Sequence, residues 1–102
     1  MEVYTETIEN EIALSKVPVL VEFFAKWCRP CEVMEPTIRD VATQMKGSAK
    51  VLTLNIEKNR KLSSELNVLN LPTFLVYKNG KMIMRLSGVQ EKEVLVKLLR
   101  EA

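Results

Sequence analysis

Histidine is absent from this chain of 102 residues, and cysteine and glycine are rare, with two and three residues respectively. The absence of histidine removes the side chain that most often serves as a general base or metal ligand near neutral pH. Two cysteines cannot complete a zinc site within one chain, because a closed site takes four ligands. They are also too few for a small secreted scaffold held by disulfides. Three glycines and four prolines exclude collagen-like and Pro/Gly-rich disordered chains.

Long apolar runs and a dominant charge are also missing. The longest apolar stretch covers residues 18–25, is interrupted by Glu22 and is far too short to span a membrane. The 15 Lys and Arg residues and 13 Asp and Glu residues are scattered and leave a formal charge of +2, with no basic stripe. The first residues show no secretory signal. We therefore expect a cytoplasmic protein that binds neither nucleic acid nor membranes.

Hydrophobic patterning predicts a single α/β domain over residues 1–102, without repeats or linkers. Strands are expected at 3–4, 19–25, 51–56, 73–77 and 81–86. Helices are expected after an N-cap at Thr5 or Thr7, from the cysteine motif to Gly47, over 59–66 and near the C-terminus. Strands that alternate with helices are expected to be parallel, and Asn79-Gly80 predicts a tight turn between the last two strands. The expected fold is a mixed central sheet, in the order βαβαβαββα, with helices on both faces.

Apolar residues at helical spacing indicate which helix faces are buried. The expected core positions are Val33, Met34, Ile38, Val41, Ala42 and Met45 in the second helix, and Val94, Leu95, Leu98 and Leu99 in the last. The five methionines are interpreted as core residues. Asn67 is expected to close the third helix in a left-handed conformation.

The segment Trp27-Cys28-Arg29-Pro30-Cys31 carries the strongest chemical signal. It follows a buried strand directly and opens a helix. A thiol at a helix N-terminus meets free backbone N–H groups and the positive end of the helix dipole, which stabilise its thiolate. Pro30 suits the first turn, where a missing N–H costs nothing. Two reduced core cysteines, or half of a metal site shared between two chains, are the alternative interpretations.

The sequence resembles the thioredoxin family over nearly its whole length. The matching landmarks are the segment from Phe23 to Cys31, Pro36, Leu71-Pro72-Thr73, Lys78-Asn79-Gly80 and Gly88. The resemblance implies that Cys28 attacks a protein disulfide and that Cys31, one turn further and less exposed, resolves the mixed disulfide. It also implies no metal or organic cofactor beyond the Cys28–Cys31 disulfide. An NADPH-dependent thioredoxin reductase is the implied electron donor, and the implied state is a monomer.

Three further positions are assigned to substrate docking by the same resemblance. It implies a cis peptide bond before Pro72, with the backbone of Leu71 pairing with an extended target segment. Trp27 and Gly88 are expected to complete the docking surface, Gly88 by letting backbone approach the sulfur closely. A proline that merely begins a strand, and a tryptophan that merely fills the core, are the alternatives.

Glu22 lies in the middle of a strand that is expected to be buried. Burial disfavours the charged carboxylate, so we expect a raised pKa. The family usually has an aspartate here, below the second cysteine, and the resemblance implies that Glu22 is a general base for Cys31. The family often adds a lysine on the next strand, where this chain has Thr53; the sequence leaves open whether Lys26 compensates. The alternative is a solvent-facing glutamate on an edge strand.

Arg29 departs from the most common family motif, W-C-G-P-C. Arg29 and Pro30, between the cysteines, are the expected potential-tuning residues. A cation beside Cys28 stabilises the thiolate and makes the disulfide a stronger oxidant, unless solvent screens it. The leading hypothesis is a protein-disulfide reductase. A more oxidising disulfide oxidase or isomerase, a non-redox binding module, and a homodimer that holds a metal or Fe–S centre are the alternatives.

Overall fold

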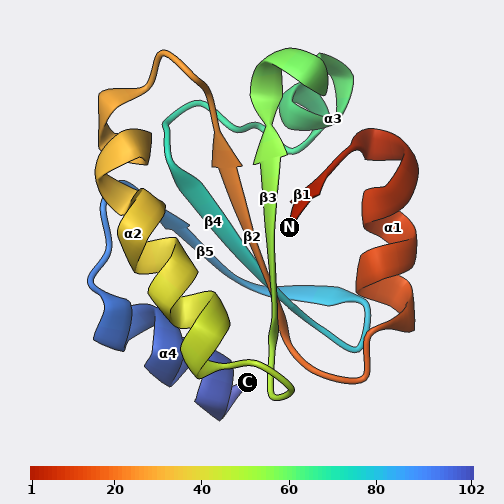
Figure 1. Ribbon diagram of the computed structural model, residues 1–102. Helices are drawn as coiled ribbons and strands as arrows, with labels where there is room; N and C mark the ends of the chain where they lie inside the picture. The colour runs from red at the N-terminus through yellow and green to blue at the C-terminus, as the bar shows by residue number, and fades with distance from the viewer.

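A five-stranded mixed sheet forms the centre of the computed structural model, which describes residues 1–102 (Figure 1). The strands lie in the order β1-β3-β2-β4-β5. Strands β1 and β2 pair in parallel with β3, whereas β4 runs antiparallel to both β2 and β5. Their bounds are Glu2–Val3 for β1, Val19–Phe24 for β2, Lys50–Asn55 for β3, Thr73–Lys78 for β4 and Lys81–Ser87 for β5. The mixed sheet expected from the sequence is confirmed.

Helices cover both faces of this sheet, as the order of elements predicted. Figure 1 shows α2 and α4 on one side of the sheet and α1 and α3 on the other. The helices are α1 (Thr5–Leu14), α2 (Arg29–Gln44), α3 (Arg60–Glu65) and α4 (Lys92–Glu101), and a short 3₁₀ helix, η1 (Ile56–Lys58), precedes α3. No helix has the length and apolar composition that crossing a membrane requires.

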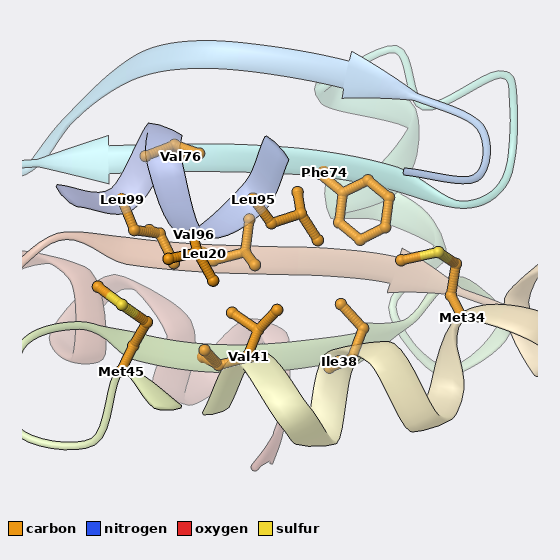
Figure 2. Close-up of a cluster of buried hydrophobic side chains, with 11 residues drawn as sticks. Leu20, Met34, Ile38, Val41, Met45, Phe74, Val76, Leu95, Val96 and Leu99 are labelled. Carbon is orange, nitrogen blue, oxygen red and sulfur yellow. The ribbon is translucent and has the colours of Figure 1, made fainter. Parts of the chain in front are cut away.

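The alternation of side chains along β2 divides the core into two clusters. Leu20 packs with Met34, Val41 and Leu95 in the cluster below α2 and α4, which Figure 2 shows. The odd-numbered residues of β2 pack instead in the cluster that α1 and α3 cover; they are Val19, Val21 and Phe23. Glu22 has the same parity as Leu20, so its side chain is on the side of α2.

The helical faces differ in part from those predicted. Val33 and Val94 are exposed, whereas Val96 is buried. In α2 the buried positions Cys31, Met34, Ile38 and Val41 repeat at steps of three and four, which leaves Val33 outside the apolar face. Met34 and Met45 are core residues as expected; Met1, Met82 and Met84 are exposed, the last two on the edge strand β5.

Helix α1 begins differently from the prediction. Its N-cap is Tyr4, and neither Thr5 nor Thr7 occupies that position. Thr7 lies three residues into the helix, where its hydroxyl oxygen accepts from the N–H of Tyr4 at 3.3 Å. The N–H of Thr5 donates to the side-chain oxygen of Asn59 at 2.7 Å. A buried asparagine that is distant in the sequence therefore accepts a hydrogen bond from a backbone N–H at the start of α1, a partner that the local sequence does not predict.

Two asparagines adopt the positive backbone angles that their positions predicted. Asn79 and Gly80 have φ values of 53° and 79° and form the turn of the β4–β5 hairpin. Asn67 has φ of 54° and ends the α3 segment. It directs the chain into the loop that leads to Pro72.

Candidate active site

Cys28 and Cys31 are joined by a disulfide bond at the N-terminus of α2. Cys28 is the N-cap, and its Sγ accepts a hydrogen bond from the backbone N–H of Cys31 at 3.2 Å. The Cα atoms are 5.3 Å apart. Arg29 and Pro30 occupy the first turn, where Pro30 removes an N–H that the helix does not use. The interpretation as two reduced core cysteines therefore does not hold.

The two cysteines are equally enclosed. Cys28 is 4% exposed and Cys31 is 6% exposed. The expectation that Cys31 is the less exposed of the two is wrong for the oxidised chain. The physical reason is local packing: both cysteines lie in a small apolar cluster with Ala25, against which Ile56 and Leu71 pack.

Trp27 and Arg29 both face solvent beside this disulfide. Trp27 is 68% exposed, so the alternative that it fills the core is excluded. Arg29 is exposed and forms no ion pair; the ion pairs of the chain join Arg39 to Glu35, Lys50 to Glu11 and Lys58 to Glu2. The positive charge of Arg29 is therefore not neutralised by any carboxylate of the protein.

The loop before β4 approaches the disulfide from the other side. The Leu71–Pro72 peptide bond is cis. The C=O of Pro72 accepts from the N–H of Gly88 at 2.8 Å, which ties this loop to the end of β5. The backbone N–H and C=O of Leu71 have no hydrogen-bond partner within the chain. An edge of unpaired backbone is therefore left next to the cysteines.

Gly88 is required by its backbone angle. Its φ is +84°, a conformation that other residues adopt only with strain. A Cβ atom placed there would meet no atom within 4 Å. Crowding within the free protein therefore does not explain why this residue is glycine. That Gly88 lets the backbone of a docked target approach the sulfur closely stays a prediction.

A hollow of about 340 Å³ lies between the loop and the helix terminus. Trp27, Cys28, Ile56, Leu69 and Leu71 line it, with Arg29 as its one charged residue. The hollow is apolar and borders the disulfide. It has the character of a docking site for a short apolar segment.

Glu22 is buried in the centre of the sheet, on the side of α2. It is 5% exposed and lies on β2 between β3 and β4, in register with Thr53 and Phe74. The alternative of a solvent-facing glutamate on an edge strand is therefore wrong. Its Oε2 atom has no hydrogen-bond partner. Burial, and to a smaller extent the negative charge of Glu35, raise the pKa of Glu22 from an ordinary value of 4.5 to about 7.

Glu22 and Cys31 line the same cavity, which has a volume of about 560 Å³. Charged residues from two elements border it, namely Glu2 of β1 and Glu32, Glu35 and Arg39 of α2, together with Lys26 of the loop before α2. Lys26 forms no ion pair with Glu22. The carboxyl group of Glu22, with its raised pKa, therefore borders the same cavity as the second cysteine.

Glu35 was missed by the sequence reasoning, although a signal for it was present. It lies four residues after Cys31, so one helical turn places both on the same side of α2. The structure describes no group of three or more His, Cys, Asp or Glu residues that could hold a metal ion.

A disulfide at a helix N-terminus, next to a cavity that is lined by a buried carboxyl group of raised pKa, defines a thiol–disulfide oxidoreductase. The family model for thioredoxin matches residues 1–101. The chain is 37% identical to a thioredoxin of Rickettsia felis over 90 residues, which cover 88% of this chain and 86% of the relative. It is 32% identical to thioredoxin 1 of a Nostoc species over 100 residues, with 98% and 94% covered. The chain belongs to the thioredoxin family.

Structural comparison agrees with this assignment. A crystal structure of chloroplastic thioredoxin z superposes with a TM-score of 0.91 at 28% identity, over 98% of this chain and 90% of that one. The chain is also 32% identical to a chloroplastic M-type thioredoxin of Chlamydomonas reinhardtii, with 94% of this chain and 69% of the relative covered. The protein is thus a dithiol–disulfide oxidoreductase that acts on protein disulfides. The family needs no cofactor beyond its redox-active disulfide.

Proposed function

We propose that Cys28 is the nucleophile and Cys31 the resolving cysteine. The position of Cys28 carries this assignment: its Sγ sits at the N-cap of α2 and accepts the N–H of Cys31. In the reduced protein the same N–H and the helix dipole stabilise a thiolate at Cys28 and lower its pKa. Cys31 lies inside the helix and has no such position, so it keeps its proton longer.

The reaction then proceeds in two exchanges. The Cys28 thiolate attacks one sulfur of a target disulfide, the target S–S bond breaks, and the second target sulfur leaves as a thiolate that takes up a proton. Cys31 loses its proton and attacks the Sγ of Cys28, which releases the first target sulfur. Two electrons pass from the dithiol to the target, and the Cys28–Cys31 disulfide of the present structure forms.

Glu22 is the proposed acceptor of the Cys31 proton. Both residues line one cavity, and no other carboxylate of the chain is buried. A general base works best when its pKa lies near the working pH, and the pKa of Glu22, at about 7, meets that condition. Because Glu22 and Cys31 line one cavity and no hydrogen bond joins them, water in the cavity is the proposed route for the proton.

Trp27, Leu71, Pro72 and Gly88 form the proposed docking surface. The unpaired backbone of Leu71 can add an extended target segment as a short strand. Exposed Trp27 supplies an apolar face next to the hollow. Such a surface binds the main chain and a few apolar side chains of a target, which suits a protein that reduces several targets.

The remaining assignments follow from the family and from the direction of the reaction. We propose that residues 1–102 act as one monomeric domain, reduced by an NADPH-dependent thioredoxin reductase and working as a reductant in the cytoplasm. Neither nucleic acid nor membrane is part of the proposed function.

The reduction potential of the Cys28–Cys31 couple tests the proposal directly. Equilibration with defined thiol buffers, followed by trapping of free thiols, is expected to give a reversible two-electron couple near about −270 mV. Cys28→Ser is expected to abolish reduction of protein disulfides, whereas Cys31→Ser is expected to accumulate the mixed disulfide. Absence of a reversible couple would overturn the redox assignment and favour a binding module.

A more oxidising protein is the second candidate, and Arg29 is the observation that favours it. Its charge lies next to Cys28 without a carboxylate partner. A potential of about −180 mV or higher would assign the protein to disulfide oxidation or isomerisation instead.

A further inference from the structure

Arg85 on β5 joins the edge strand to the end of α3. Its guanidinium group donates to the backbone C=O of Leu66 at 2.6 Å and to that of Asn67 at 2.5 Å. The two bonds use different nitrogen atoms, Nη1 and Nη2, so the planar group binds both carbonyls at once. Arg85 has no carboxylate partner that would compete for these donors.

The two carbonyls belong to the turn at the C-terminal end of α3, which two other backbone hydrogen bonds stabilise. The N–H of Asn67 donates to the C=O of Ser64, and that of Val68 donates to the C=O of Ser63, both at 3.0 Å. With Asn67 at φ of 54°, these bonds form a Schellman motif. The motif leaves the carbonyls of Leu66 and Asn67 directed outward, at the negative end of the helix. These are the two carbonyls that accept hydrogen bonds from Arg85.

This turn leads directly into the loop that lines the hollow beside Cys28. Val68, Leu69, Asn70 and Leu71 follow Asn67 without a break, and all four border that hollow. At the far end of the loop the Thr73 hydroxyl donates to the C=O of Asn70 at 2.5 Å. The exposed Leu69 between these ends has little packing of its own to hold it.

We propose that Arg85 is a positioning residue for protein targets: by clamping Leu66 and Asn67 it holds the 68–71 loop in the conformation that a docked target segment meets. This inference rests on the proposed docking surface. Arg85 does not touch the disulfide, so the clamp acts on the recognition of large targets and leaves the sulfur chemistry unchanged. A loop ordered before binding need not be ordered by the target, which lowers the entropic cost of docking.

Two substrates separate this role from general damage to the fold. Insulin is a protein disulfide that must dock, whereas 5,5′-dithiobis(2-nitrobenzoate) is a small disulfide without a polypeptide segment that could pair with the 68–71 loop. For Arg85→Ala we expect the KM for insulin to rise about two- to tenfold with little change in kcat. The rate with the small disulfide and the reduction potential are expected to stay at the wild-type values.

Arg85→Lys and Lys81→Ala are the matched variants. A lysine ammonium is a point charge without the planar fork, so Arg85→Lys is expected to recover only part of the KM for insulin. Lys81→Ala removes a positive charge from an exposed position of the same strand, where the side chain makes no hydrogen bond within the chain, and is expected to behave like the wild type. If Arg85→Ala does not fold, Arg85→Lys alone decides, by a raised or an unchanged KM for insulin.

Three results would overturn the proposal: an unchanged KM for insulin in the Arg85 variants, an equal loss with both substrates, or an equal loss in Lys81→Ala. The first shows that the clamp is irrelevant to docking, the second that it only supports the fold, and the third that net charge steers the target. Wild-type protein that fails to reduce insulin would contradict the docking surface itself, independently of Arg85.

Discussion

Glu22 of β2 lies in register with Thr53 of β3, so the strand next to the buried carboxyl group carries a hydroxyl where the family often has a lysine. The cations that border the same cavity, Lys26 and Arg39, make no ion pair with Glu22, and Arg39 is paired with Glu35 at 2.7 Å. Burial therefore dominates the pKa of Glu22, and Glu35 adds to it.

Glu22→Gln is expected to change how the stability of the oxidised protein depends on pH. The folded state holds the Glu22 proton up to about pH 7, whereas the unfolded state releases it near 4.5. The folded state thus binds more protons in this window, and the stability falls as the pH rises through it. This one group is expected to remove about 3 kcal/mol between pH 4.5 and pH 8. Urea unfolding at both pH values measures it, and the glutamine variant should lack this part of the decrease.

Thr53→Lys is expected to restore a cation beside the buried carboxyl group. An opposite charge at short range lowers the pKa of a carboxyl group, here by about 1 to 3 from the wild-type value. Carbon NMR titration of the Glu22 carboxyl group measures the change, with Thr53→Met as a control of similar size without charge. A pKa that moves equally in both variants would show that the hydroxyl, and not the missing cation, sets the value.

Arg29→Gly is expected to make the reduction potential more negative. Removing the cation destabilises the Cys28 thiolate and therefore the reduced form. Because Arg29 is exposed and its charge is screened, we expect a change of roughly 10 to 30 mV, measured by equilibration with thiol buffers at low and at moderate salt. A change that does not shrink with salt would mean that Arg29 acts through backbone geometry at the helix start.

Asn59→Ala is expected to destabilise the fold without altering the disulfide chemistry. The side-chain oxygen of Asn59 accepts from the N–H and the hydroxyl of Thr5, at 2.7 and 2.9 Å, and its amide donates to the C=O of Asn55. Loss of these buried bonds is expected to cost about 1 to 3 kcal/mol. Thermal unfolding measures the loss, and an unchanged reduction potential shows that the active site is intact. Thr5→Val, which removes only the hydroxyl, should cost less.

Much of the fold could be predicted because period-two and period-3.6 patterns are strong in this chain. The hairpin at Asn79-Gly80, the left-handed Asn67 and the buried position of Glu22 follow from local chemistry. The N-terminus of α1 could not be predicted locally, since Asn59 lies 54 residues from Thr5. The Arg85 clamp had no sequence signal for the same reason, because no spacing rule links β5 to the end of α3.

The candidate site was predicted unevenly. The cysteine motif lies within one helical turn, so local rules placed it directly after β2 at the start of α2. The similar enclosure of Cys28 and Cys31 depends on Ile56 and Leu71, which the fold brings in from distant segments. Glu35 acts on Glu22 across the gap between a helix and a strand, a distance that only three-dimensional packing determines.

The alternation of side chains along β2 has a consequence for folding fidelity. A slip of one residue in the pairing of this strand would exchange its two faces. Val21 and Phe23 would leave the cluster that α1 and α3 cover, and Glu22 would enter it among the apolar side chains of Leu54 and Leu75. An unsolvated carboxyl group makes such a register unfavourable by several kcal/mol. The same side chain that is proposed to accept a proton therefore also selects the correct strand alignment against its nearest competitors.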